Sequence, residues 1–248
     1  MEHELWFTAL LNDYLAGAAS AILALFRVHA ENAARPWQNF VSMQILVVLI
    51  IMVVFAVLRK RLSVEQPGKF QHTFEVVYEF LDSTAHEVLG HQARPHVAFF
   101  GTLFFFILFS NLLGIIPSLE SPTMFIPAPV PAGCAMAAFL YYNIQGAREQ
   151  GAFNYMKHFA GPVWWLAPLM IPIEVISHLA RPMSLTIRLF ANMFAGEQVT
   201  IIFLSLVPVV IPAIFMGLHV FVAFLQAFIF TLLTMVYVQG AVEHANEH

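Results

Sequence analysis

One arginine, Arg188, is the residue of this sequence whose surroundings most clearly predict chemistry. It lies in the run SLTIRLFANMFAGE (residues 184–197), where the neighbouring side chains are typical of a helix embedded in lipid. The guanidinium group stays charged at every physiological pH, and placing it at membrane depth costs roughly 3 kcal/mol on insertion scales. A charge retained in that setting predicts a functional role for Arg188.

Further polar side chains recur at helical spacing on two segments near the end of the chain. On the first segment, Glu174, Arg181 and Arg188 are seven residues apart, so they form one stripe on a helix, which Asn192 and Ala195 extend. The second segment carries a matching stripe of His219, Ala223, Gln226, Phe230 and Tyr237. The two stripes predict a polar seam between lipid-embedded helices.

An antiparallel hairpin that turns near Pro208 would bring residues equally far from the turn to equal depth. Counting outward from that turn pairs Arg188 with Gln226, Glu197 with His219, and Ser177 with Tyr237. Glu197 and His219 then fall nearer the outer turn, and the inner end holds Glu174, Ser177, His178 and Tyr237. The titratable residues are therefore expected at both ends of the seam, with Arg188 between them.

Proton transfer is the chemistry that these residue types allow. Glu and His side chains in water-filled pockets gain and lose protons near neutral pH after modest pKa shifts. An arginine cannot relay a proton, but it attracts a carboxylate on another protein and keeps two proton pathways from joining. The pattern predicts two offset half-pathways separated by a fixed positive charge.

Composition indicates the elements that must hold this seam. The 248-residue chain is 60% hydrophobic and 10% charged, with a mean hydropathy of +0.76, which is far above the range of soluble domains. We predict an all-α polytopic membrane protein with about five membrane-embedded helices, an amphipathic helix on the cytoplasmic surface, and a long, strongly tilted C-terminal hairpin.

Seven basic residues outside the seam are expected in the cytoplasm. They cluster in two connecting segments, as Arg59, Lys60, Arg61, Lys69, Arg94, Arg148 and Lys157. By the positive-inside rule these segments face the cytoplasm, which places the N-terminus outside and the C-terminus inside. Residues 1–39 are then an N-terminal extracytoplasmic segment, and residues 40–248 form a single membrane domain.

Individual elements follow from hydropathy and periodicity. Leu5 to Phe26 is predicted to be an amphipathic surface helix, and residues 70–88 a second one on the cytoplasmic side. The predicted spans are Phe40–Leu58, Val97–Leu119 and Ala132–Ile144. An external loop is expected at Pro122–Pro131 and an inner loop at Arg148–His158.

The hairpin itself occupies residues 162–240. A helical pattern continues from Pro162 to Leu206, roughly twice the length needed to cross the bilayer core, so this helix must tilt or bend. Pro168, Pro172 and Pro182 predict kinks in it. A turn at 206–212 leads to a last helix at Ala213–Gly240.

The sequence resembles subunit a of the F-type ATP synthase, the membrane stator beside the rotating c-ring. The resemblance rests on SHLARPMSLTIRLFANMFAGE (177–197) and LQAFIF (225–230), with support from PGKF (67–70) and NLLGIIP (111–117), and extends from about residue 40 to the C-terminus. Ala191 replaces a glycine common in the family, which is a small-for-small change.

The resemblance implies a role for each polar residue of the seam. Arg188 matches the essential charge that faces the ring carboxylates. The outer half-channel would contain Glu197, His219, Asn192 and Gln226, with Gln226 facing the arginine. The inner half-channel would contain Glu174, Ser177 and Tyr237. The roles of Arg181 and His178 stay open.

The family also implies partners and a location. A proton-translocating stator of this kind works with the c-ring, the peripheral-stalk subunit b and the rest of the synthase, in a bacterial inner membrane. The sequence has no G-x-x-x-x-G-K-[ST] nucleotide motif, so ATP chemistry belongs to another subunit and the chain is not an enzyme on its own. No cofactor, metal or nucleic acid is expected, and the coupling ion, H⁺ or Na⁺, stays open.

Other interpretations explain some of the same residues. A secondary ion-coupled transporter would use a similar seam but usually shows internal repeats, which this sequence lacks. Arg188 could be a structural cation, and Glu174 with Arg181 an internal ion pair. Asn192 and Gln226 could simply join helices, at about 1 kcal/mol. His86, His91 and His96 lie five residues apart, on different helix faces, which disfavours a metal site.

Overall fold

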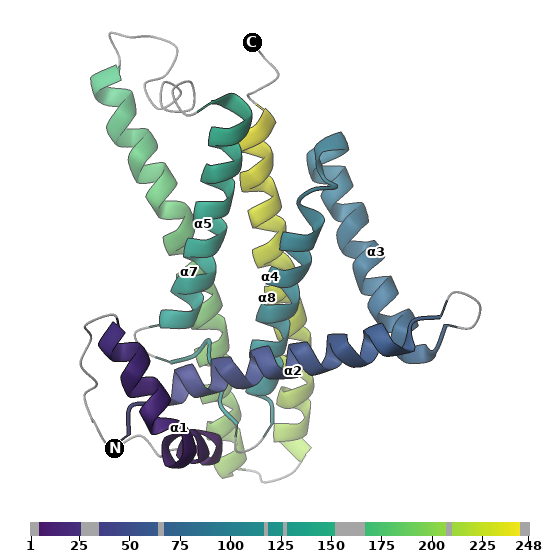
Figure 1. Cartoon of the computed structure of the whole chain (residues 1–248), viewed down its shortest axis with the longest axis vertical. Helices are drawn as coiled ribbons and strands as arrows, with labels where there is room; N and C mark the ends of the chain where they lie inside the picture. The colour runs from purple at the N-terminus through teal and green to yellow at the C-terminus, as the bar shows by residue number, and fades with distance from the viewer. Residues whose placement is uncertain are drawn as a thin grey trace.

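The computed structural model describes residues 5–25, 35–63, 67–116, 119–125, 128–151, 167–206 and 210–243. These residues form helices α1 (Trp6–Leu25), α2 (Asn39–Arg61), α3 (Lys69–Leu89), α4 (Val97–Leu113), α5 (Pro129–Gln150), α7 (Ala167–Leu206) and α8 (Val210–Glu243), with a 3₁₀ turn at Gly90–Gln92 (Figure 1). No strand occurs in the described part of the chain. The predicted all-α class is confirmed.

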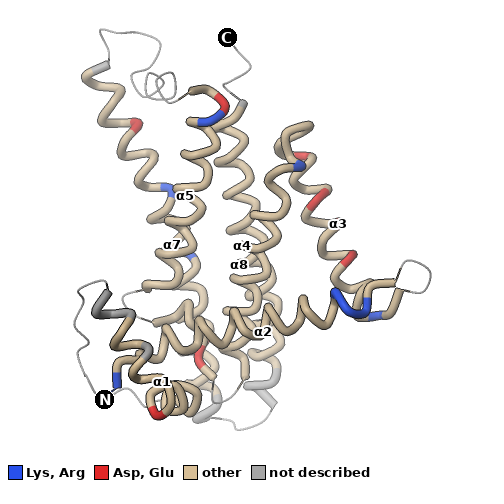
Figure 2. The backbone as a smooth tube through the Cα atoms, viewed as in Figure 1, with Lys and Arg blue, Asp and Glu red and all other residues tan. Residues whose placement is uncertain are grey.

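Two of the described helices are long and apolar enough to cross a bilayer. They are α2, with a mean hydropathy of 3.0, and the Ile214–Val242 portion of α8, with 2.2. The predicted span Phe40–Leu58 is therefore confirmed as a helix and is extended by the basic residues Arg59–Arg61, which lie near the start of α3 (Figure 2).

The long helices do not run parallel to α2. Figure 1 shows α2 crossing α4, α5, α7 and α8, which extend along the long axis of the molecule and pack against one another. At 1.5 Å per residue the 40 residues of α7 extend about 60 Å, twice the thickness of the bilayer core. An upright α2 therefore requires a strongly tilted α7 and α8, as predicted.

The N-terminal helix α1 agrees with the predicted helix from Leu5 to Phe26 but is kinked at Leu15, which has φ −125° and ψ 17°. The indole Nε1 of Trp37 donates to the Leu15 carbonyl at 2.9 Å, and the Trp37 amide donates to Asn12 Oδ1 at 2.9 Å. These bonds attach the kinked helix to the chain just before α2.

Helix α4 ends at Leu113, so the predicted span to Leu119 is wrong at its C-terminal end. The chain turns at Gly114 and folds back, and Ser121 Oγ donates to the Ser110 carbonyl at 2.9 Å. A Cβ on Gly114 would lie only 2.8 Å from the Ser121 Cβ, so this close approach requires glycine. With 17 residues, α4 is too short to cross 30 Å of hydrocarbon upright.

The segment Pro122–Pro131, predicted to be an external loop, is partly a packed turn and partly helix. Thr123 is fully buried and donates to Asn111 Oδ1 at 2.9 Å, while Pro129 begins α5 in the first-turn position that suits proline. Helix α5 is longer at both ends than the predicted span Ala132–Ile144 and includes Arg148. The inner loop expected at Arg148–His158 thus begins inside a helix, and its residues 152–158 lie outside the described ranges.

Helix α7 continues through Pro172 and Pro182 as one helix. Pro168 lies in its first turn, where no helical hydrogen bond is lost, so no kink is needed at that position. Residues 162–166 and the centre of the expected turn, 207–209, lie outside the described ranges. The last helix begins a few residues earlier than the predicted Ala213 and ends slightly after Gly240.

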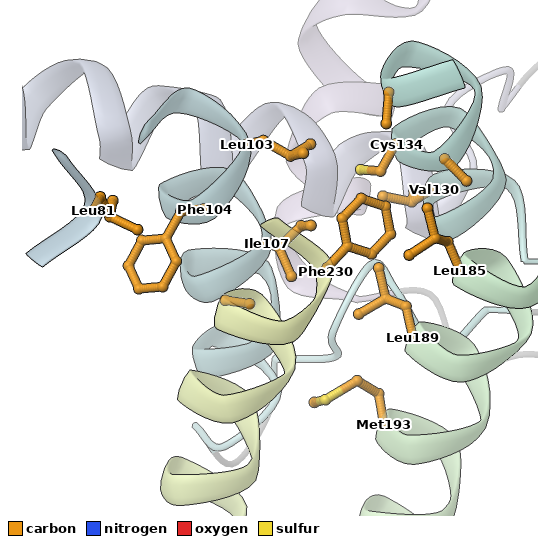
Figure 3. Packing of buried hydrophobic residues seen from close by; sticks show 13 residues of the cluster. Leu81, Leu103, Phe104, Ile107, Val130, Cys134, Leu185, Leu189, Met193 and Phe230 are labelled. Carbon is orange, nitrogen blue, oxygen red and sulfur yellow. The ribbon is translucent and has the colours of Figure 1, made fainter. Parts of the chain in front are cut away.

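The main hydrophobic core lies where α4, α5, α7 and α8 meet. Figure 3 shows the Phe230 ring of α8 between Ile107 of α4 and Leu185 of α7, with Cys134 of α5 above it. Leu189 and Met193 continue this buried row along α7. The core fixes the rotation of α7, and therefore the direction in which its polar residues face.

Candidate functional site

The packing of α7 places Arg188 at the edge of the core. His178, Leu185, Leu189 and Met193 form the buried stripe of this helix. Arg188 precedes Leu189 by one residue, about 100° around the helix, and is partly exposed. Among the described residues, no carboxylate forms an ion pair with its guanidinium group. The Arg188 side chain therefore packs against apolar residues on one side, and its guanidinium group is accessible on the other.

One turn from Arg188, two amide side chains join α7 to α8. Asn192 Nδ2 donates to Gln226 Oε1 at 2.8 Å, and Gln226 is only 2% exposed. The remaining polar atom of that glutamine, Nε2, is buried and has no hydrogen-bond partner within the described ranges. The expected depth match between Gln226 and Arg188 holds to within about one turn, but the direct bond of Gln226 is to Asn192.

Nearer the turn of the hairpin, His219 of α8 packs against the backbone of Gly196. A Cβ added to Gly196 would lie 3.3 Å from the His219 Cε1 atom, so a side chain there would press on the imidazole ring. His219 is 7% exposed, and its Nε2 atom lacks a hydrogen-bond partner among the residues that the structure describes. The prediction that His219 lies at the same depth as Glu197 is therefore correct to within one residue.

Glu197 itself is partly buried beside this contact. Glu120, in the turn that follows α4, is close enough to act electrostatically on Glu197. Sequence periodicity did not point to Glu120 or to Gly196. The signal for Gly196 was present, since a glycine next to Glu197 on α7 offers space to the facing helix.

A second cluster lies at the other end of the seam. The Arg181 guanidinium carbon lies 5.8 Å from the ring centroid of Tyr142 and 5.2 Å from that of Tyr237, so one cation contacts rings of α5 and α8. Glu174 Oε1 lies 3.4 Å from His178 Nε2 rather than forming the alternative pair with Arg181. Ser177 is exposed, about 100° around α7 from buried His178.

The structure thus groups most of the predicted residues, together with Gly196 and Tyr142, into two clusters with Arg188 between them. The cluster nearer the hairpin turn, here named the outer cluster, contains Asn192, Gly196, Glu197, His219 and Gln226. The cluster at the other end of the seam, here named the inner cluster, contains Tyr142, Glu174, His178, Arg181 and Tyr237. Arg181 and Gly196 lie about 10 Å from Arg188 in opposite directions along α7. Of the inner cluster, Tyr142 was missed, because no periodicity connects its segment to α7.

The three histidines considered as a metal site do not come together. His86 Nδ1 lies 2.8 Å from the Asp82 carbonyl one turn earlier, and His96 Nδ1 lies 2.7 Å from the Tyr141 hydroxyl. In the described part of the chain, no group of three or more His, Cys, Asp or Glu side chains is arranged to hold a metal ion.

Comparison with known proteins gives a consistent family. Residues 40–239 match the model of the family described as ATP synthase A chain. The chain is 62% identical to the ATP synthase subunit a of Solibacter usitatus over 96% of this chain and 100% of that protein. It is 46% identical to the ATP synthase subunit a of Koribacter versatilis, over 100% of both chains. With ATP synthase subunit a 1 of Syntrophotalea carbinolica it shares 46% identity, over 81% of this chain and 84% of that one.

Proposed function

Since the chain belongs to the ATP synthase A chain family, and is thus a membrane subunit of the F-type ATP synthase, we propose that it is the stator through which protons reach and leave the rotating c-ring. Arg188 faces the ring carboxylates, and two offset aqueous half-channels lead to them from opposite sides of the membrane. The chain couples proton flow to rotation, and ATP chemistry takes place in other subunits.

The outer half-channel of this proposal uses the cluster around His219. A proton enters past Glu197 and His219, two residue types that can gain and lose protons, and continues past Asn192 and Gln226 to a ring carboxylate. The buried Nε2 atoms of His219 and Gln226 support this role, because water in the channel would satisfy them. Once neutral, the ring carboxyl group can face lipid at a far lower cost than the carboxylate.

The inner half-channel uses Glu174, Ser177 and Tyr237. After nearly a full revolution the ring carboxyl group reaches this side and releases its proton toward the cytoplasm. Arg188 then stabilises the resulting carboxylate and keeps the two half-channels apart, because a guanidinium group does not give up its proton at physiological pH.

The membrane voltage supplies the work. Each charge that crosses gains about 2.3 kcal/mol per 100 mV, so several protons must pass for each ATP made. The coupling ion of this proposal is H⁺. The ring itself, the peripheral-stalk subunit b and the remaining synthase subunits are the partners, with lipid covering the other exposed apolar faces.

The proposed topology follows the basic residues. In this topology Arg59–Arg61 at the end of α2 and the neighbouring helix α3 face the cytoplasm, while α1 and the N-terminal segment lie outside. The C-terminus is cytoplasmic, and the membrane is the bacterial inner membrane.

The observation that carries the proposal is the position of Arg188. A permanent charge sits on a helix of apolar residues, next to buried Leu185 and Leu189, and is still partly exposed. That arrangement makes the guanidinium group available to a carboxylate on a neighbouring subunit. A charge kept at membrane depth without such a use would cost several kcal/mol.

The test replaces Arg188 with alanine in the complete synthase and measures ATP-driven acidification of inverted membrane vesicles. Arg188→Ala should abolish acidification while the complex still assembles with its c-ring. Arg148→Ala, which removes an exposed arginine at the end of α5, should acidify normally. Normal acidification by the Arg188→Ala complex would overturn the proposal.

A further inference from the structure

The imidazole of His178 connects two groups that can exchange protons. Its Nδ1 atom lies 3.1 Å from the hydroxyl of Tyr142 on α5, and its Nε2 atom lies 3.4 Å from Glu174 Oε1 on α7. Both ring nitrogens therefore face a proton donor or acceptor. This is the arrangement in which a histidine takes a proton at one nitrogen and releases one from the other.

Exposure decreases steadily along this row of three side chains. The Glu174 side chain is 35% exposed, that of His178 is 11% exposed, and Tyr142 is 1% exposed. The row thus leads from an accessible carboxylate into the contact between α5, α7 and α8, where the Tyr142 and Tyr237 rings lie 5.9 Å apart.

Arg181 supplies the positive charge that the buried Tyr142 phenol needs if it is to take part in proton transfer. A free phenol has a pKa of about 10, so a fully formed phenolate is costly near neutral pH. The Arg181 guanidinium group lies over both tyrosine rings and stabilises negative charge that develops on the Tyr142 oxygen. Among the described residues, the charged and titratable groups near His178 include Glu174 and Arg181 of α7, Tyr142 of α5, and Tyr237 of α8 beyond it.

We infer that His178 is a proton-relay residue of the inner pathway and that Tyr142 is its partner on α5. A proton that arrives at the Tyr142 oxygen replaces the phenol's own proton, which moves to His178 Nδ1. The proton on Nε2 moves to Glu174 Oε1 and from there to the cytoplasm. One proton enters and one leaves, and the imidazole returns to its starting tautomer before the next transfer. This inference rests on the proposed function and extends the inner half-channel to α5.

The first test uses His178→Gln in the complete synthase, because glutamine keeps two hydrogen-bonding groups but cannot relay a proton. Passive proton flux through membrane vesicles stripped of the catalytic sector should fall by about 10-fold or more. The dependence of flux on pH should also lose its inflection in the range where histidine titrates. A histidine with a merely structural role would leave the shape of that pH profile unchanged.

A matched control exists in the same molecule. His96 and Tyr141 form a second His–Tyr pair, at 2.7 Å, near the start of α4 and outside the row formed by Glu174, His178 and Tyr142. His96→Gln and Tyr141→Phe should leave proton flux and its pH profile unchanged. Copurification of the c-ring oligomer with each variant confirms assembly.

Two further measurements keep the inference testable if one variant fails to assemble. Added imidazole should restore flux to His178→Ala, since a diffusible base can occupy the space that the side chain leaves. Tyr142→Phe should slow flux, and the double variant with His178→Gln should be no slower than the slower single variant. Wild-type flux in assembled His178→Gln, or additive losses in the double variant, would overturn the relay.

The outcomes separate this inference from the proposed function. If Arg188→Ala abolishes pumping while His178→Gln conducts protons with an unchanged pH profile, only the relay is wrong. If Arg188→Ala pumps normally, the proposed function fails whatever His178 does.

Discussion

Gly196 sets how closely the two helices of the hairpin approach at His219. Its Cα hydrogen occupies the position where any other residue would place a Cβ, 3.3 Å from the His219 ring. That spacing is tighter than an ordinary contact, so the imidazole must shift by a few tenths of an ångström if a methyl group is added. Small displacements of a proton-transfer group slow the transfer steeply.

We therefore predict that Gly196→Ala lowers ATP-driven proton pumping by roughly 3-fold to 10-fold, with assembly unchanged. Alanine also favours the helix, by up to about 1 kcal/mol relative to glycine, so loss of folding is not expected. Gly101→Ala in α4 is the matched control, because a Cβ there meets no atom within 4 Å. Pumping at the wild-type rate by the Gly196→Ala complex would show that His219 tolerates the shift.

At the scale of residues, sequence identified the chemical types but not their direct partners. Arg188, Asn192, Gln226 and His219 stood out because polar side chains are rare in such apolar segments. The bond between Asn192 and Gln226 depends on side-chain rotamers and on helix rotation, which periodicity fixes only to within about one turn. Tyr142 could not be found, since a tyrosine in another helix carries no sequence signal of its contact with His178.

At the scale of elements, the antiparallel register of α7 and α8 is the feature that organises the site. The contacts Gly196 with His219, Asn192 with Gln226, and Arg181 with Tyr237 all agree with one register. These contacts extend from Arg181 to Gly196 on α7 and from His219 to Tyr237 on α8, so a slip by one turn would break all three.

This register predicts selective crosslinking. In a Cys134→Ala background, which removes the only native cysteine, the pair Gly196→Cys and His219→Cys should react with a short thiol crosslinker. The pair Gly196→Cys and Gln226→Cys should not, because position 226 lies about 10 Å further along α8. Mass spectrometry of the digested protein measures both products, and equal yields would contradict the register.

Helix identities were predictable and several helix ends were not. Hydropathy and periodicity located every described helix, because long apolar or amphipathic runs give a strong signal. The early end of α4 depends on the tight approach of Gly114 and Ser121, which are close in space only after the chain has turned back. The start of α5 at Pro129 likewise could not be predicted, since a proline-rich segment is typical of both a loop and a first helical turn.

At the scale of the whole molecule, the second core cluster ties α3, α4, α5 and α8 together at the end remote from the hairpin turn. It includes Ala85, Phe100, Tyr142 and Val238, one from each helix. His96 lies beside this cluster, is 5% exposed, and shares a hydrogen bond with Tyr141. Burial lowers the pKa of His96 from its ordinary value of 6.5, and Glu149 partly opposes that effect.

A pH dependence of stability follows from this lowered pKa. The unfolded chain takes up the His96 proton near pH 6.5, whereas the folded protein takes it up only at a lower pH. The stability contributed by neutral His96 is therefore complete above pH 6.5 and declines as the pH falls from 6.5 toward the lowered folded value. Thermal unfolding of the wild type should show this decline, and His96→Gln should show less of it.

The matched control for this measurement is His91→Gln, which changes an exposed histidine in the preceding turn. It should keep the pH dependence of the wild type. An identical decline in His96→Gln would mean that other groups control the acid sensitivity of the fold.

The slant of α7 and α8 relative to α2 has a geometric consequence for any rotor beside them (Figure 1). Two sites on an upright helix lie one above the other, but on an inclined helix a difference in height is also a displacement along the membrane. In the proposed mechanism, a carboxylate that travels sideways on a ring can therefore meet the two half-channels one after the other without moving up or down. The inclination of two helices, with the Arg188 charge between the half-channels, would thus turn a vertical ion gradient into horizontal motion.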